Sequence, residues 1–285
     1  MFKKMLVCTD LSPASDALIH CVEELKTIGM EEVILTHVIY VANTPGLEEM
    51  LVEEARPAVE RQKKTLEDQG IRVVVEMPFG LPAHTLNETA EKHDVSAILI
   101  GSHGKGIIQA ATLGSVTAKL LHLTRRPILM ARIAILNGEK CHLACGKLFS
   151  KILFPSDFSE TAERALEYVG KIAAETKSPV TLLHVYDDKN LDNETRQRLE
   201  DGRSFFSESK KERLKSRGIF DVTVETTFGN PAQVILDRTY KGDFSIIVMG
   251  SQGKGLVQEV FIGSVSNKVV REAGLPVLLI PSAHK

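Results

Sequence analysis

The stretch Ala97–Ser115 reads A-I-L-I-G-S-H-G-K-G-I-I-Q-A-A-T-L-G-S, a short apolar run followed by glycines in the pattern G-x2-G-x9-G-S. The same pattern returns 149 residues later, in Ile246–Ser264. Glycines between a strand and a helix let backbone N–H groups approach an anion without a Cβ in the way. The two copies therefore predict two phosphate-binding loops, and hence two nucleotide sites in one polypeptide.

The repeat extends beyond these loops and indicates a duplicated domain. An acidic residue closes the first apolar run of each half, a His-Val pair closes the second, and a Phe-Gly pair follows the third. These landmarks are Asp10 and Asp157, His37-Val38 and His184-Val185, and Phe79-Gly80 and Phe228-Gly229. The period is much longer than that of a solenoid repeat. We expect one nucleotide-binding domain at residues 1–135, a linker at 136–150 and a second such domain at 151–285.

Composition is that of an ordinary globular protein. The chain has 285 residues, of which 43% are hydrophobic and 25% charged, with a formal net charge of −2. This charge makes nucleic acid an unlikely main partner. No apolar stretch is long enough to span a membrane and no signal-peptide pattern is present, so a cytoplasmic protein is expected. Four cysteines require no disulfide in that compartment.

Strand and helix patterns alternate through each half. The first half has five short apolar runs, and amphipathic or N-capped stretches separate them. The expected strands are 5–9, 33–39, 71–76, 97–100 and 127–131, and then 151–155, 180–185, 221–226, 245–249 and 276–280. Alternation of this kind predicts an α/β fold: two tandem doubly wound domains, each with a five-stranded parallel sheet. We expect the strand order 3-2-1-4-5 in each sheet. A long helix is expected at 47–69, with a kink or interruption at Pro57.

Sheet topology then predicts where a ligand lies. In a doubly wound sheet the ligand binds beyond the carboxyl ends of the strands, where the winding reverses. With the order 3-2-1-4-5, that reversal falls between the strand closed by Asp10 and the strand closed by Gly101. Asp157 and Gly250 hold the same places in the second half. Phosphates are expected on the glycine loop and on the N-terminus of the helix that follows it, which leaves the carboxylate for the base or ribose.

These residues resemble the universal stress protein family, and the tandem form is the closer match. The resemblance rests on the doubled glycine pattern, on the Asp that closes the first strand and on the His-Val that closes the second. It implies ATP or AMP as ligand, with or without a divalent cation on the phosphates. The implied binding residues are Asp10, Val38, Gly101, His103, Gly104, Gly114, Ser115 and Val116 in the first half, and Asp157, Val185, Gly250, Gln252, Gly253, Gly263, Ser264 and Val265 in the second. One departure from the family pattern is Cys8, where the second half has Pro155.

Several of these residues also have a structural interpretation. Asp10 and Asp157 could cap the helices that follow them. His37 and His184 lie on strands, where a structural role is more common than a catalytic one. The loop lysines are followed by glycine and not by Ser or Thr, so neither loop is a Walker A motif.

Three functions fit the sequence. The first is a nucleotide-binding stress-response or regulatory protein with little or no turnover. The second is a slow ATPase or a nucleotidyl-transfer enzyme, and the third is a scaffold or chaperone-like protein with vestigial sites. The sequence favours the first and assigns no catalytic residue, because it contains no recognisable nucleophile–base set or Walker B acid. Glycines retained in both loops weigh against the third.

The linker contains Cys141, His142 and Cys145. This C-H-x2-C arrangement could supply metal ligands or a redox pair, but its C-x3-C spacing differs from that of common zinc sites. We therefore interpret the two cysteines as inert thiols and predict no metal site.

The fifth strand of each half is apolar and would be an exposed edge if it were unpaired. A 15-residue linker, extended at up to ~3.3 Å per residue, is long enough to let the two halves face each other. We therefore expect the halves to pack as an internal pseudo-dimer through their fifth strands. Further association into a homodimer is left open by the sequence.

The pairing of the halves can be tested with two charges. Leu129→Glu combined with Leu278→Glu should separate or unfold the halves, because a buried unpaired carboxylate is costly in an apolar contact. Small-angle X-ray scattering of the full chain should then give a larger radius of gyration than the wild type gives. An unchanged scattering profile would contradict the pairing.

Overall fold

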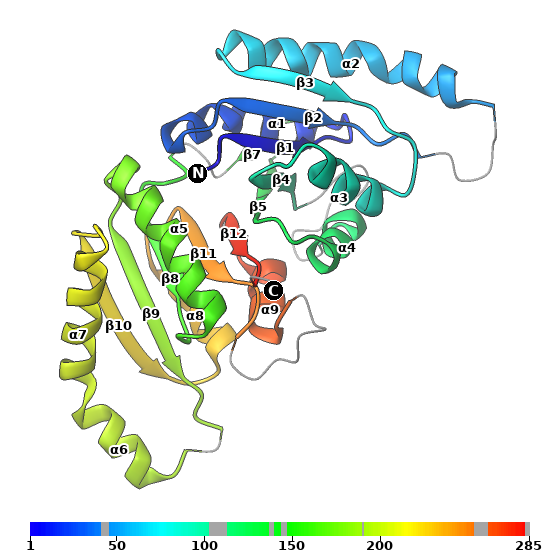
Figure 1. Cartoon of the computed structure of the whole chain (residues 1–285). Coiled ribbons are helices and arrows are strands. Elements are labelled where there is room, and N and C mark those ends of the chain that lie inside the picture. Colours follow the sequence, from blue (N-terminus) through cyan, green and yellow to red (C-terminus); the bar gives the residue numbers. More distant parts are fainter. Residues whose placement is uncertain are drawn as a thin grey trace. The chain divides into compact units, whose positions relative to one another are not determined.

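The structure is a computed structural model, and it describes residues 1–40, 46–102, 113–136, 140–143, 147–189, 191–253 and 262–282. The chain divides into two compact units, Met1–Gly146 and Lys147–Lys285. Both contain the predicted alternation of strands and helices (Figure 1).

Unit 1 has a five-stranded parallel sheet of order β3-β2-β1-β4-β5. The predicted fold class and strand order are therefore confirmed for this unit. Its elements are β1 (Lys4–Cys8), α1 (Pro13–Cys21), a 3-10 helix (Val22–Ile28), β2 (Glu32–Thr36), α2 (Glu48–Asp68), β3 (Arg72–Glu76), α3 (Pro82–Lys92), β4 (Ala97–Gly101), α4 (Ser115–Leu123), β5 (Ile128–Ala131), β6 (Ile133–Leu136) and β7 (Lys140–Leu143).

Unit 2 repeats this order as β10-β9-β8-β11-β12, again with parallel neighbours. The predicted fold class holds here as well. Its elements are β8 (Ile152–Pro155), α5 (Glu160–Thr176), β9 (Val180–Tyr186), α6 (Asn193–Asp201), α7 (Arg203–Ser216), β10 (Val222–Phe228), α8 (Pro231–Lys241), β11 (Ile246–Gly250), α9 (Ser264–Glu272) and β12 (Val277–Ile280).

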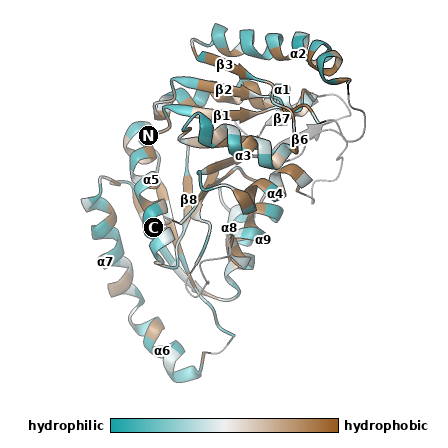
Figure 2. Ribbon diagram, turned by 45° about the vertical axis from the view of Figure 1, so that its right-hand side comes forward, coloured by the Kyte–Doolittle hydropathy of each residue, from teal (hydrophilic) through white to brown (hydrophobic). Residues whose placement is uncertain are grey.

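Helices cover both faces of each sheet, which explains why the central strands are apolar without alternation. In unit 1, α1 and α2 lie together on one face and α3 and α4 on the other (Figure 1). The strands are mostly brown in Figure 2, whereas α2 is largely teal. Leu6 and Val7 of β1 are completely buried. Burial of each such side chain contributes roughly 1.5–3 kcal/mol, so the sheet and its two helical layers hold each unit together.

The first helix of each unit begins at a serine cap. Ser12 accepts a hydrogen bond from the Ser15 backbone N–H (3.3 Å), and Ser159 accepts one from Ala162 (3.2 Å). Pro13 occupies the first position of α1, where no backbone N–H is needed. Both helices therefore start within one short turn of the aspartate that follows the central strand, at the edge of the sheet where the sequence predicts a ligand.

Two features differ from the sequence-based expectations. Helix α2 runs from Glu48 to Asp68 without the interruption expected at Pro57. Pro57 is exposed, so the carbonyl that loses its partner can bond to water, while the buried face keeps its packing. In addition, an antiparallel hairpin of β6 and β7 occupies part of the predicted linker, and β7 lies beside α1.

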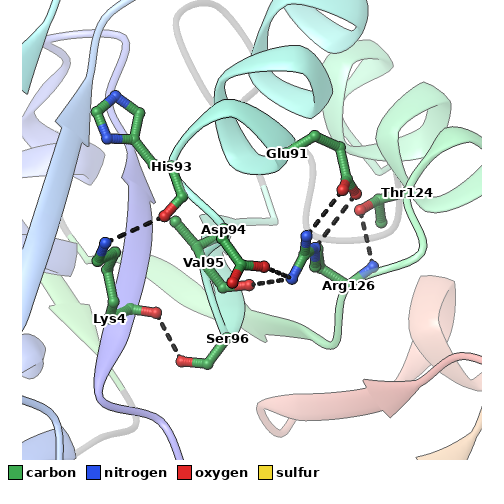
Figure 3. Close-up of polar contacts among 8 residues, drawn as sticks. All are labelled: Lys4, Glu91, His93, Asp94, Val95, Ser96, Thr124 and Arg126. Atoms are coloured by element: carbon green, nitrogen blue, oxygen red, sulfur yellow. Dashed lines mark hydrogen bonds and ion pairs between the residues drawn. The ribbon is translucent and has the colours of Figure 1, made fainter.

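An ionic cluster holds the amino-terminal end of the first sheet (Figure 3). The Arg126 guanidinium donates to both carboxylate oxygens of Glu91 (2.8 and 3.2 Å) and to Asp94 (2.8 Å). It also donates to the Val95 carbonyl (3.0 Å), which ties the segment before β5 to the end of α3. The hydrogen bond from Arg126 lowers the pKa of the Glu91 carboxyl.

This lowered pKa predicts a pH-dependent contribution to stability. The folded-state pKa of Glu91 lies below its unfolded value, so the pair stabilises the protein above the unfolded pKa and loses that effect as the pH falls through the folded pKa. Glu91→Gln should lower the free energy of unfolding by about 0.5–1 kcal/mol at pH 7, a modest amount because solvent screens the pair. The difference should shrink as the pH falls through the folded-state pKa of Glu91 and vanish once the carboxyl is protonated in both states. Chemical denaturation across pH measures it, with Glu88→Gln, exposed on the same helix, as control; equal losses in the two variants would contradict the assignment.

Candidate nucleotide-binding sites

A cavity lies at the carboxyl ends of the strands in each unit, where β1 and β4, or β8 and β11, diverge. The first has a volume of about 270 Å³ and the second about 780 Å³. Predicted site residues that line the first cavity are Asp10, Val38, Gly101, Gly114, Ser115 and Val116. Those that line the second are Asp157, Val185, Gly250, Gln252, Gly253, Gly263, Ser264 and Val265. The structure thus brings these residues together in each unit, while His103 and Gly104 lie outside the described residues.

The aspartate that closes the central strand forms a tight turn in both units. The Asp10 carboxylate accepts hydrogen bonds from the Ser12 backbone N–H (3.1 Å) and the Ser15 hydroxyl (2.6 Å). The Asp157 carboxylate accepts one from the Ser159 backbone N–H (3.0 Å). These bonds give both aspartates a structural role, in addition to their place in the cavity wall.

The residue after each aspartate has a left-handed backbone. Leu11 has φ 61° and Phe158 has φ 58°, values uncommon for residues other than glycine. In each unit the N–H of that residue is bonded to a hydroxyl two positions earlier, that of Thr9 (3.1 Å) or Ser156 (3.2 Å). The same uncommon conformation in both units is therefore held by local hydrogen bonds.

The two strand histidines act as ties within the site. The Nδ1 atom of His37 lies 3.0 Å from the Thr9 carbonyl, and that of His184 lies 2.7 Å from the Ser156 carbonyl. Because a carbonyl only accepts, Nδ1 carries the proton in each case. Each histidine thus joins the second strand to the turn before the aspartate, in line with the structural interpretation of the sequence.

The backbone of the following valine faces the cavity. His37 and Ile39 donate to carbonyls on the β3 side, those of Glu76 (3.0 Å) and Pro78 (2.9 Å). Alternation along an extended chain therefore turns the N–H and C=O of Val38 to the β1 side, beyond the last ladder bond from Thr9 to Thr36. The backbone of Val185 is oriented in the same way. On one side of it the Leu183 carbonyl accepts a hydrogen bond from the Ser156 N–H, and on the other the Tyr186 carbonyl accepts one from the Gly229 N–H. Each cavity wall thus offers one donor and one acceptor at this point.

The glycine loops are closed at their base. The Gly114 N–H donates to the Ser102 carbonyl (3.0 Å), and the Gly263 N–H donates to the Ser251 carbonyl (2.7 Å). Thr117 and Ser266 each donate a side-chain hydrogen bond of 2.9 Å back to the glycine that ends the strand, Gly101 or Gly250. These bonds hold the start of the following helix directly against the end of the strand.

The helices that follow the loops begin without a side-chain cap among the described residues. Gly114 is the N-cap of α4 and Gly263 is the N-cap of α9, and neither has a side chain that can accept a hydrogen bond. The first backbone N–H groups of each helix therefore point into the cavity mouth, where the helix dipole also favours an anion. This end of each cavity is suited to phosphate.

At two positions of the second glycine pattern, neighbouring atoms leave no room for a Cβ and so explain why glycine is present. A Cβ on Gly250 would lie 2.9 Å from Thr161 Cγ2 and 3.1 Å from the Thr161 carbonyl carbon, in the first turn of α5. A Cβ on Gly253 would lie 2.6 Å from an Asp157 carboxylate oxygen. Gly250 therefore serves the packing of α5 on β11, whereas Gly253 brings the loop close to the aspartate. The sequence pattern alone does not distinguish these two roles.

Several cavity residues were not predicted from the sequence. Tyr186 and Asp187 line the second cavity, and Cys8 lines the first. Burial raises the pKa of the Cys8 thiol well above its usual range, so this sulfur is a neutral wall group. The sequence did contain one signal for Tyr186, because it directly follows the predicted Val185. Consecutive residues at the end of a strand on this edge of the sheet are exposed to the cavity.

Comparison with known proteins defines the class. A tandem pair of doubly wound domains, each with a glycine loop at the switch point, matches the family model "Universal stress protein family" at residues 1–132 and 148–281. The chain belongs to the universal stress protein family, with two such domains in tandem, as the resemblance indicated.

Individual relatives agree with this assignment. A universal stress protein of Methanocaldococcus jannaschii is 32% identical over 46% of this chain and 96% of its own length. One of Mycolicibacterium smegmatis is 24% identical over 97% of this chain and 96% of its own. The crystal structure of a universal stress protein from Archaeoglobus fulgidus is 27% identical and matches 98% of both chains with a TM-score of 0.78. Another universal stress protein, crystallised in complex with cAMP, matches 48% of this chain at 19% identity and a TM-score of 0.40.

Two negative findings concern the described residues. Among them, no helix is long and apolar enough to cross a membrane. No group of three or more His, Cys, Asp or Glu side chains gathers there in a way that could hold a metal ion. The side chains of Cys141, His142 and Cys145 lie outside the described part of the chain, so their interpretation stays a prediction.

The packing role of Gly250 is testable. Gly250→Ala should lower the free energy of unfolding by about 1–3 kcal/mol, because its new methyl group would overlap the first turn of α5. The matched control is Gly274→Ala, since a Cβ at Gly274 meets no atom within 4 Å. Chemical denaturation of both variants measures the difference, and equal stabilities would refute the packing role.

Proposed function

We propose that each unit binds one adenine nucleotide and that the protein acts as a nucleotide-dependent regulator in a stress response. The observation that carries the proposal is that four features line one cavity in each unit: a carboxylate, a backbone donor and acceptor, glycines that flank the loop, and a helix N-terminus without a side-chain cap among the described residues. Membership of the universal stress protein family supports the same function.

The base is proposed to lie against Val38 in unit 1 and Val185 in unit 2. Adenine presents a ring-nitrogen acceptor beside an amino donor, which complements one backbone N–H and one C=O. Guanine presents the opposite pair on the corresponding edge, so its nucleotides should bind more weakly. The carboxylates of Asp10 and Asp157 are then placed to accept hydrogen bonds from ribose hydroxyls.

The phosphates are proposed to lie at the N-termini of α4 and α9. Backbone N–H groups and the helix dipole supply attraction there without a lysine of the Walker type. A divalent cation bound to the phosphates would reduce their charge but is not required by this geometry. Both ATP and AMP remain candidate ligands, because the helix end can receive phosphate of either.

Little turnover is part of the proposal. Hydrolysis needs a base that orients water against the terminal phosphate. Among the described residues, the wall at the phosphate end of the second cavity consists of Gly263–Ser266, which offers backbone groups and hydroxyls. These groups bind an anion but are not general bases at neutral pH.

Nucleotide binding is tested by titration calorimetry of the full chain with ATP, AMP and GTP. We expect two adenine nucleotides per chain, GTP weaker by about tenfold or more, and single-turnover phosphate release far slower than the typical enzymatic ~10 per second. Gly253→Val should remove one site, because its side chain would displace the Asp157 carboxylate. Gly104→Val, at the matching position of the first sequence repeat, should remove the other.

The control for these variants is Gly274→Val, which adds the same side chain in open space. It should bind as the wild type does, and all variants should keep nearly the wild-type melting temperature. Absence of ATP and AMP binding by the wild type, or full binding by the double variant, would refute the proposal.

A further inference from the structure

We propose that Tyr186 forms a base-contacting wall of the second cavity and makes unit 2 the tighter of the two adenine-nucleotide sites. This inference rests on the function proposed above. It assigns an affinity-determining residue that the first unit lacks at the matching position.

Tyr186 stands beside the proposed base position. It lines the second cavity and directly follows Val185, whose backbone N–H and C=O face that cavity. Its side chain is half-buried, so one part of the ring packs in the protein while another part is accessible. A flat base held at Val185 would therefore meet this ring, and contact between a base and an aromatic side chain is favourable for every base.

The ring is held in place by other aromatic side chains. Its centroid lies 4.6 Å from that of His184, edge to face, and 5.2 Å from that of Phe228. Phe206 of α7 packs against His184 with a centroid distance of 5.6 Å. Because His184 is itself fixed by its bond to the Ser156 carbonyl, the cluster keeps Tyr186 in one orientation before a ligand arrives.

Cations on the outer side reinforce this cluster. The Lys210 ammonium lies 4.0 Å from the centroid of Phe158, and the Arg196 guanidinium lies 4.7 Å from that of Phe228. Such contacts favour a fixed aromatic face. Burial raises the pKa of the Tyr186 phenol, against a smaller opposing effect of Arg203, so the hydroxyl stays protonated at neutral pH and can donate to a ligand.

Among the described residues of the first unit, none lines its cavity at the position that matches Tyr186. Ile39 occupies the position of Tyr186, but it is only 3% exposed and is not among the described residues that line the first cavity. Leu11 replaces Phe158, so the support for an aromatic face is also missing. On this segment the described lining of the first cavity ends at Val38. The first cavity has a volume of about 270 Å³, whereas the second has about 780 Å³.

The test combines calorimetry with tyrosine fluorescence, using ATP as the probe. The chain has no tryptophan and four tyrosines, so tyrosine emission can report contact with the base. Wild-type protein should show two affinities and a quench on filling the tighter site. Tyr186→Ile, the residue of the first unit, should weaken the tighter site by about tenfold or more and leave the weaker one unchanged.

Tyr186→Phe keeps the aromatic ring and removes the fluorescent phenol. It therefore tests the role of Tyr186 in a variant that is expected to keep the packing of the ring. It should bind ATP within about threefold of the wild type but lose the quench. Tyr240→Phe, at an exposed site whose hydroxyl donates to the Glu272 carbonyl (3.2 Å), is the control and should keep both. Gly253→Val identifies which affinity belongs to unit 1.

Three results would overturn the inference while leaving the proposed function intact. These are unchanged affinities in Tyr186→Ile, a loss confined to the site that survives in Gly253→Val, or an undiminished quench in Tyr186→Phe. Failure of the wild type to bind ATP or AMP would instead refute the proposed function, and this inference with it.

Discussion

The early end of the central strand is the constraint on which the site depends. In each unit the neighbouring chain stays hydrogen-bonded on its other side after the last ladder bond to the central strand. That last bond runs from the Thr9 N–H to the Thr36 carbonyl or from the Ser156 N–H to the Leu183 carbonyl. A parallel sheet alternates its hydrogen bonds between two neighbours, so the residue two positions after that bond, Val38 or Val185, has no ladder partner on the side of the central strand. The backbone of Val38 or Val185 is thereby turned to the cavity, and the fold itself creates a polar recognition edge in an otherwise apolar wall.

The remaining parts of the site keep that edge open. The aspartate turn and the left-handed residue after it direct the chain away into the first helix, while the strand histidine fixes the turn through a carbonyl. On the other side, Thr117 or Ser266 ties the first turn of the next helix to the glycine that ends its strand. Two helix beginnings therefore flank one gap. One is closed by its serine cap, and the other has no side-chain cap in the part of the chain that the structure describes.

Duplication kept this architecture but not the lining of the two cavities. Residues that make the hydrogen-bonded frame are matched in both units, from the aspartates to the loop glycines. Residues outside this frame differ between the units, such as Cys8 against Pro155 and Ile39 against Tyr186. The hydrogen-bonded residues are constrained by backbone geometry, whereas the other residues around the cavity can be replaced without disturbing the fold. The two cavities can therefore differ in ligand affinity within one fold.

The sequence by itself determined the strands and most of the cavity residues, because apolar periodicity, serine caps and repeated glycines act locally and recur at matched positions. The strand order 3-2-1-4-5 was an expectation that no local pattern encodes, and the tertiary structure confirmed it. It did not determine that α2 continues through Pro57, that part of the predicted linker forms a hairpin, or that Gly250 serves packing and Gly253 the aspartate. It also did not predict the cluster around Tyr186, whose rings come from a turn, two strands and a helix far apart in the chain. Such contacts are decided only when tertiary packing brings distant segments together, since no local pattern records which side chains will meet.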